Sequence, residues 1–158
     1  MAKGKSHLER TISYLIEHEG HDRAHIAKVE QYIQGRGAHH GFKRDMFGWC
    51  DLVLLDKQQH RTVGIQVCGS DWSPHVKKLR GERAARCLDW LDVGNAIELW
   101  GWRKLKNRWT PRIELIEEAW VLNGRTRNDV FNPPVVEDVK VEGAIVAPPL
   151  EEQVLVEW

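Results

Sequence analysis

The sequence has little cysteine and no long apolar run. Its three cysteines are odd in number and lack C-x-x-C spacing, so a disulfide framework and a structural zinc site are not expected. No stretch approaches the roughly 18 consecutive apolar residues of a membrane span. Residues 1–10 lack the apolar segment of a signal peptide. These absences predict a cytoplasmic protein without a membrane span.

Net charge is also absent, because 23 basic side chains balance 23 acidic ones. The balance is uneven along the chain. Residues 133–158 contain six acidic side chains and one basic side chain, so residues 1–132 have a net charge of +5. A basic body suits a polyanionic partner. Two Pro-Pro pairs and alternating valines predict a Pro-rich acidic C-terminal arm over 123–158, after a single domain over 1–122.

The spacing of apolar residues predicts one helix, three strands, a second helix and two more strands. Ser73 and Pro74 suit the start of the second helix, which Gly94 can close. The glycine-rich, basic stretch 34–45 is predicted to be a loop. The predicted helices cover 6–19 and 74–93, and the strands cover 25–33, 51–55, 62–68, 96–102 and 111–122. This order favours an α/β or α+β fold with a small mixed β-sheet flanked by helices.

Two polar residues stand out in the hairpin predicted over 51–68. Asp51 begins one strand, and Gln66 lies inside its apolar neighbour, where a buried amide requires hydrogen-bond partners. Oxygen ligands on adjacent strands can converge on one hard divalent cation if they point to the same side of the sheet. The alternative is a turn residue at Asp51 and a plain hairpin.

Four segments carry a resemblance when their order and spacing are taken together: "DMFGWCD" (45–51), "IQVC" (65–68), "HVKKL" (75–79) and "GWRK" (101–104). They resemble the PD-(D/E)xK nuclease superfamily and, within it, a phage and bacterial group similar to Holliday junction resolvases. Residues 3–20 also look like the first helix of those resolvases. The likeness covers about residues 4–120. It implies a restriction-endonuclease-like core and a homodimeric, Mg²⁺- or Mn²⁺-dependent endonuclease that cleaves branched DNA.

The resemblance also implies roles for individual residues. Asp51, Gln66 and the backbone carbonyl of Val67 would hold the metal ion, and Glu9 would complete the site or hold a water molecule. The protein would act in the cytoplasm of a bacterium, or of the host cell if a phage encodes it.

The sequence departs from the family pattern at two positions. Gln66 stands where a carboxylate is usual, and Cys68 stands where a lysine would orient the attacking water. Lys77 or Lys78 could replace that lysine, and Asp45 could restore the missing negative charge. Alternatively, the lysine pair belongs to a solvated helix face and Asp45 to an ion pair with a neighbouring base.

Basic residues of the loop, the second helix and the segment after Trp102 are predicted to contact DNA phosphates. Trp102 is either a stacking residue beside the last of these groups or part of the core. The predicted contacts are Arg36, Lys43, Arg44, Lys77, Arg80, Arg83, Arg103 and Lys104.

Other functions fit the sequence less well or cannot be separated from the first. Another PD-(D/E)xK nuclease, of flap, single-strand or restriction type, and a catalytically inactive DNA-binding module of the same fold remain alternatives. "HDRAH" (21–25) offers two histidines at helical spacing but no third ligand, so zinc is not expected there. Cys68 has no evident histidine partner in the sequence, which disfavours a nucleophilic cysteine.

Overall fold

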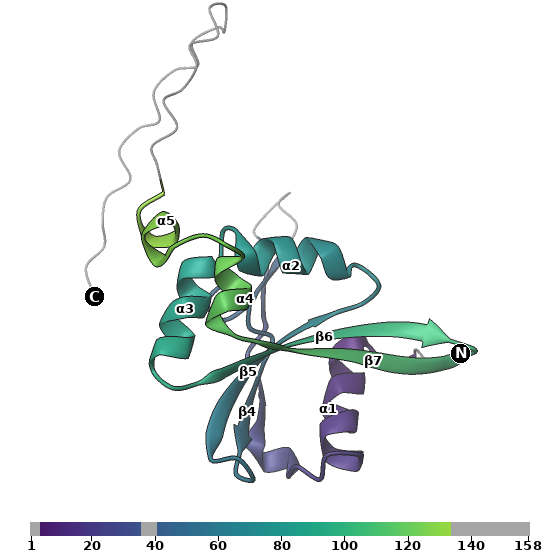
Figure 1. Cartoon of the computed structure of the whole chain (residues 1–158). Coiled ribbons are helices and arrows are strands. Elements are labelled where there is room, and N and C mark those ends of the chain that lie inside the picture. Colours follow the sequence, from purple (N-terminus) through teal and green to yellow (C-terminus); the bar gives the residue numbers. More distant parts are fainter. Residues whose placement is uncertain (1–3, 36–40, 134–158) are drawn as a thin grey trace, which may run out of the picture.

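The computed structural model describes residues 4–35 and 41–133. A five-stranded mixed sheet forms the centre of the molecule, and a two-stranded sheet accompanies it (Figure 1). The helices are α1 (His7–Glu17), α2 (Trp72–Arg80), α3 (Ala84–Asp92), α4 (Glu118–Leu122) and α5 (Arg127–Phe131). The strands are β1 (Ile26–Lys28), β2 (Gln31–Ile33), β3 (Phe42–Arg44), β4 (Leu52–Asp56), β5 (Arg61–Cys68), β6 (Ala96–Leu105) and β7 (Arg108–Ile116).

The strand order in the large sheet is β1-β4-β5-β6-β7, and β2 pairs with β3 in the small sheet. Strands β5 and β6 are parallel, with α2 and α3 in the connection between them, whereas the other pairs are antiparallel. Figure 1 shows α1 on one side of the large sheet and α2, α3 and α4 on the other. The predicted α/β class, a small mixed sheet flanked by helices, is confirmed.

The period-two alternation of the strands divides their side chains between two cores. On the α1 side, alternate strand residues such as Leu52, Ile65 and Trp100 pack with Leu15 of the helix. Trp102 is 4 % exposed there, and its indole N–H donates to Thr11 Oγ1 at 2.8 Å. Trp102 is therefore a core residue that ties β6 to α1, which answers the question the sequence left open.

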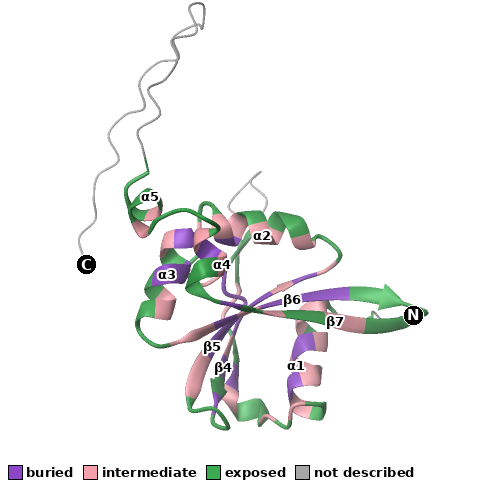
Figure 2. Cartoon of the chain, in the orientation of Figure 1, coloured by how far each residue is buried: buried purple, intermediate pink, exposed green. Residues whose placement is uncertain are grey.

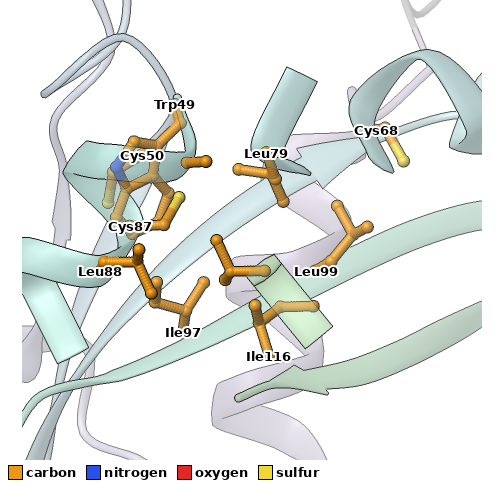
Figure 3. Close-up of a cluster of buried hydrophobic side chains, with 11 residues drawn as sticks. Trp49, Cys50, Cys68, Leu79, Cys87, Leu88, Ile97, Leu99 and Ile116 are labelled. Carbon is orange, nitrogen blue, oxygen red and sulfur yellow. The ribbon is translucent and has the colours of Figure 1, made fainter. Parts of the chain in front are cut away.

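The second core lies between the sheet and helices α2, α3 and α4 (Figure 3). Its members include Leu79, Leu88, Ile97 and Leu99, each fully buried. The burial colours of Figure 2 follow this division, with buried segments along the strands and along α1 and α3. All three cysteines, Cys50, Cys68 and Cys87, are buried and free.

Gly101 shapes the packing of α2 on β6. A Cβ atom at this position would lie 2.5 Å from the Trp72 ring, which is closer than real Cβ contacts allow. The missing side chain therefore lets the first residue of α2 rest directly on the strand. This contact fixes the start of α2 beside the end of β5.

Several predicted boundaries are wrong. The strand expected over 25–33 is a short 3₁₀ turn (Arg23–His25) followed by β1 and β2, which belong to different sheets. The predicted loop 34–45 contains β3. The strand expected over 111–122 is β7 followed by α4.

The helix expected over 74–93 is two helices, because the backbone breaks at Gly81 with φ −104° and ψ −109°. A Cβ atom at Gly81 would lie 2.7 Å from the Lys77 carbonyl oxygen. The N-cap is Asp71 and not Ser73. The break ends α2 two residues after Lys78, and α3 then packs separately on the sheet.

The C-terminal arm expected over 123–158 begins with α5, and the arm beyond residue 133 lies outside the described residues. Within the described ranges, no helix combines the length and the apolar character that crossing a membrane requires.

Candidate active site

A cavity of about 830 Å³ lies where the end of β5 meets the start of α1, α2 and the β2–β3 hairpin. Its walls are mostly polar and carry both signs of charge. The lining residues are Ser6, His7, Leu8, Lys28, Glu30, Lys43, Asp45, Asp51, Gln66, Val67, Cys68, Gly69, Ser70, Asp71 and His75. The cavity therefore contains Asp51, Gln66, Val67 and Asp45, the four residues that the sequence nominated as metal ligands.

Asp51 is held by hydrogen bonds from β5. Its Oδ2 accepts from the Val67 backbone N–H at 2.7 Å and from the Gln66 amide Nε2 at 2.5 Å. The side chains are buried, since Asp51 is 7 % exposed and Gln66 is 2 % exposed. The hairpin register explains the contact, because Leu52 pairs with Ile65 and so brings the preceding and following residues together. The sequence-based pairing of Asp51 with Gln66 agrees with this arrangement.

Lys78 extends the network from α2. Its Nζ donates to Asp45 Oδ2 at 3.0 Å and to Gln66 Oε1 at 3.3 Å. The Gln66 amide thus presents its oxygen to an ammonium donor and its nitrogen to a carboxylate acceptor, and both partners favour the same orientation of the amide. Of the two lysines that the sequence offered as substitutes, Lys78 contacts Asp45 and Gln66, whereas Lys77 is exposed and its side chain has no hydrogen bond to either residue in the described part of the chain.

The electrostatic environment disfavours a charged Asp51. Burial, together with the neighbouring carboxylates of Asp45 and Glu30, raises the pKa of Asp51 to about 7, although the Val67 N–H and the Lys78 ammonium oppose the shift. Ionisation of a carboxyl group that is costly when the group is alone becomes favourable beside a cation. The same three acids would therefore be stabilised by a divalent ion in this cavity.

The donor set has the chemistry of a Mg²⁺ or Mn²⁺ site. Carboxylate, amide and carbonyl oxygens are the ligands these hard cations prefer, and Asp51, Gln66 and Val67 supply one of each along the edge of the cavity. One adjustment is needed, because the Gln66 oxygen faces Lys78 rather than Asp51. Rotation of the terminal amide about its last bond would turn the oxygen toward Asp51. With that rotation, the residues fit the ion.

Glu9 lies apart from this group. Its carboxylate accepts from the Ser6 backbone N–H at 2.7 Å, while the Ser6 hydroxyl accepts from the Glu9 N–H at 3.2 Å, and these two bonds form a capping box at the start of α1. Glu9 does not line the cavity. Its observed role is to begin the helix, and the metal-site role expected for it has no support from its position.

The basic residues predicted to contact DNA divide into two groups. Arg80 stacks on the Trp120 ring at 4.1 Å, Arg83 packs against Gly48, and Lys43 pairs with Glu30 at 2.5 Å. These three side chains are already engaged in the fold. The other side chains are exposed and make no ion pair or hydrogen bond within residues 4–35 and 41–133; they are Arg44, Lys77, Arg103 and Lys104. Arg36 lies outside those ranges.

Sequence reasoning missed several cavity residues, chief among them Glu30, Asp71 and His75. Glu30 lies between β1 and β2, and nothing local in the sequence marks it. Asp71 and His75 do carry a signal, because they follow Cys68 by three and seven residues across a strand–helix junction. The structure gives Cys68 the nearby histidine that the sequence did not reveal.

Comparison of the chain with protein-family models, with curated proteins and with solved structures finds no match.

Proposed function

We propose that this protein is a Mg²⁺- or Mn²⁺-dependent DNA endonuclease of the PD-(D/E)xK type that cleaves branched DNA. One observation carries the proposal. Asp51 and Gln66 line one polar cavity and contact each other, and Lys78 reaches from α2 to the Gln66 amide oxygen, so an ammonium group adjoins an acid and an amide at this site. Such a group could hold a cation that activates water and could place a positive charge near the phosphate, and both favour phosphodiester hydrolysis.

Each residue has a separate role in this proposal. Asp51, the Gln66 oxygen and the Val67 carbonyl hold the cation, which stabilises charge on the phosphate and activates water. Lys78 supplies the positive charge that the motif lysine would provide. Asp45 orients Lys78 through their 3.0 Å ion pair and replaces the negative charge lost at Gln66. The mixed sheet with helices on both sides supports the same assignment.

The exposed bases give the proposal its substrate class. Arg103 and Lys104 lie near the tip of the β6–β7 hairpin, and Arg44 lies at the end of β3 beside the cavity residue Asp45. Exposed cations suit a phosphate backbone. Symmetric cleavage of a four-way junction requires two sites at a fixed separation, so we propose that the active form is a homodimer.

One observation favours a second candidate, a catalytically inactive DNA-binding module. Asp51 Oδ2 is already satisfied by the Val67 N–H and the Gln66 amide, without any ion. A site whose polar groups satisfy one another has less need of a cation than a site of opposed carboxylates. Metal-dependent cleavage separates the two candidates.

The decisive experiment compares a labelled four-way junction with linear duplex of the same sequence, in Mg²⁺, in Mn²⁺ and in EDTA. We expect metal-dependent, paired cuts in the junction. The Asp51→Asn variant should lose cleavage by about 10³-fold or more, because a metal ion contributes several kcal/mol to the transition state. Its junction binding should be largely intact. Asp89→Asn, an exposed change on α3, is the matched control and should cleave normally.

The other outcomes are equally informative. Equal cutting of flaps, single strands or linear duplex would assign a different nuclease substrate. Tight junction binding with no cuts in either metal would overturn the nuclease proposal and leave the binding module. Undiminished cleavage by Asp51→Asn would refute the site.

A further inference from the structure

Beside Asp51, the cavity contains a second group of metal-ligating side chains of different chemistry. Cys68 ends β5, Asp71 caps α2, and His75 lies in the first turn of that helix. Their ligand atoms all lie within 4.8 Å of one another, and they are the one such trio among the His, Cys, Asp and Glu side chains of the described residues. All three also line the cavity.

We propose that Cys68, Asp71 and His75 form a binding site for a borderline-soft divalent cation of the zinc class, separate from the oxygen site at Asp51. The ligand types decide the metal. A thiolate and an imidazole select Zn²⁺ or Co²⁺ over Mg²⁺, which prefers oxygen ligands alone. Three protein ligands with a fourth position open to a cavity is the arrangement that zinc adopts where it binds an exchangeable ligand.

The geometry of the Asp71–His75 pair suits a shared tetrahedral ion. Asp71 Oδ2 lies 3.5 Å from His75 Nδ1. Two ligands at zinc-bond lengths of about 2.1 Å and a tetrahedral angle would be about 3.4 Å apart. The other carboxylate oxygen, Asp71 Oδ1, accepts from the Gly69 N–H at 3.0 Å. This bond fixes the carboxylate, so that Oδ2 is turned toward the histidine.

Burial differs among the three ligands in a way that suits a site at a cavity wall. Cys68 is 4 % exposed, whereas the side chains of His75 and Asp71 are 20 % and 59 % exposed. The thiol thus anchors the ion from the protein side while solvent can reach the open position. Cys68 would bind as a thiolate, and its proton would pass to solvent.

Three features oppose the site, and the ligand charges offset one of them. Burial raises the pKa of the Cys68 thiol to about 12, so metal binding must displace its proton. The start of a helix carries partial positive charge, which disfavours a cation. The thiolate and the carboxylate bring two negative charges to the same place. His75 Nδ1 also lies 2.9 Å from the Asp71 carbonyl oxygen, so the imidazole must exchange this contact for the metal or rotate to present Nε2.

Cation binding at this site does not depend on the proposed nuclease function. Only its role in cleavage rests on that function, because Cys68 stands where the family motif has a lysine. A zinc-class ion held by Cys68 would place a Lewis acid at that position, with its two charges balanced by the thiolate and the carboxylate.

Cobalt is the probe, because thiolate-bound Co²⁺ gives a ligand-to-metal charge-transfer band that carboxylate-bound Co²⁺ lacks. The metal-free full-length chain is titrated with Co²⁺ and then with Zn²⁺, without DNA. We expect one Co²⁺ per chain with the charge-transfer band, and its displacement by Zn²⁺ but not by excess Mg²⁺. Cys68→Ala should abolish the band. His75→Ala and Asp71→Asn should weaken binding by about 100-fold or more, which exceeds the usual effect of losing a ligand's supporting group.

Matched controls separate this site from adventitious binding. Cys87→Ala removes an equally buried thiol from α3, and His18→Ala removes an exposed histidine from the end of α1; both should leave the titration unchanged. If Cys68→Ala does not fold, His75→Ala and Asp71→Asn still test the site, because their side chains are less buried than that of Cys68.

Absence of the band in the parent protein, or its retention in Cys68→Ala, would overturn the proposal, as would equal losses in the Cys87 control. Asp51→Asn should keep the cobalt spectrum while it loses cleavage. Failure of the nuclease proposal would therefore leave the cobalt result unaffected, and failure of the cobalt site would leave Mg²⁺-dependent cleavage unaffected.

Discussion

The Gln66 amide nitrogen lies 2.5 Å from Asp51 Oδ2, so the two side chains that the sequence nominated as metal ligands contact each other directly. The amide oxygen is turned the other way, toward Lys78. Metal binding by Gln66 therefore requires this hydrogen bond to break and the amide to rotate. After rotation the amide nitrogen would face the Lys78 ammonium, two donors in contact, so Lys78 must move away as well. Cation binding and loss of the Lys78–Gln66 contact are thus coupled, whereas the rotation leaves the ion pair of Lys78 with Asp45 in place.

Replacement of Asp51 by asparagine should stabilise the protein at neutral and alkaline pH. The pKa of Asp51 is raised from 3.8 to about 7 in the folded state. Ionising Asp51 therefore costs more free energy in the folded protein than in the unfolded chain. Parent stability should fall as pH rises from about 4 to about 7, because the native state binds the extra proton over that window. Asp51→Asn should lack this fall and exceed the parent by up to a few kcal/mol at pH 8. Urea unfolding of both proteins across this range provides the measurement, and an advantage that persists unchanged at pH 3 would contradict the assignment.

Lys78→Met should reduce metal-dependent cleavage by about 100-fold or more, as the loss of a charge aimed at the reacting phosphate does elsewhere. The variant should also have a higher pKa at Asp51, because the Lys78 charge lowers that pKa in the parent protein. The pH–rate profile would then move to higher pH, an effect that a merely local packing defect would not produce. Lys57→Met, an exposed change in the β4–β5 turn, is the control. An unmoved pH profile in Lys78→Met would show that this lysine does not act on Asp51.

Gln66→Glu should make stability depend on metal. It places a second carboxylate against Asp51, which disfavours the metal-free fold at pH 8, and it restores a charged ligand for Mg²⁺. We expect a lower Tm without metal and a larger rise with Mg²⁺ than in the parent, at about 2–4 °C per kcal/mol for a chain of this size. Gln59→Glu adds the same charge at an exposed turn and should show neither effect. Equal Mg²⁺ responses in the parent and Gln66→Glu would argue against a metal ligand at this position.

The hairpin bases should contribute to DNA binding through charge alone. The side chains of Arg103 and Lys104 are exposed and make no ion pair or hydrogen bond within the part of the chain that the structure describes. Replacing both by alanine should weaken junction binding and reduce the slope of log K against log salt by about 2. Arg80→Ala should leave that slope unchanged but lower stability, because Arg80 stacks on Trp120. Filter or fluorescence binding over a salt series distinguishes the double variant from Arg80→Ala. A reduced slope in Arg80→Ala and an unchanged slope in the double variant would place the DNA on the α2–α4 side.

The local sequence pattern was sufficient to predict the site where its residues lie on strands that are neighbours in the chain. The short apolar runs 51–55 and 62–68, joined by a polar turn, predict β4, β5 and their hairpin, and this pairing brings Asp51 beside Gln66. Pattern reasoning failed for the helix expected over 74–93, because the helical spacing of apolar residues continues through Gly81, whereas the helical backbone ends before it. The break depends on how α2 and α3 each pack on the sheet, and helical periodicity contains no record of that.

Contacts between segments that are distant in the chain could likewise not be predicted from the sequence. Glu30 enters the cavity from the β1–β2 connection, and its charge helps to raise the pKa of Asp51 although the two residues are far apart in the chain. Choosing Lys78 over Lys77 required the direction of each side chain on α2. The Cys68, Asp71 and His75 group lies across a strand–helix junction, where neither the strand period nor the helix period applies.

The alternation along β5 has a consequence for how the sequence can change. Gln66 and Cys68 face α2, while Ile65 and Val67 face α1, so adjacent residues serve chemistry and packing in turn. Inserting or deleting one residue in this strand would exchange the two sets, burying the amide against α1 and turning isoleucine into the cavity. Such a change would lose the fold together with the site. Folding itself therefore constrains the length of β5, whereas a substitution at 66 or 68 would change the site and leave the strand register in place.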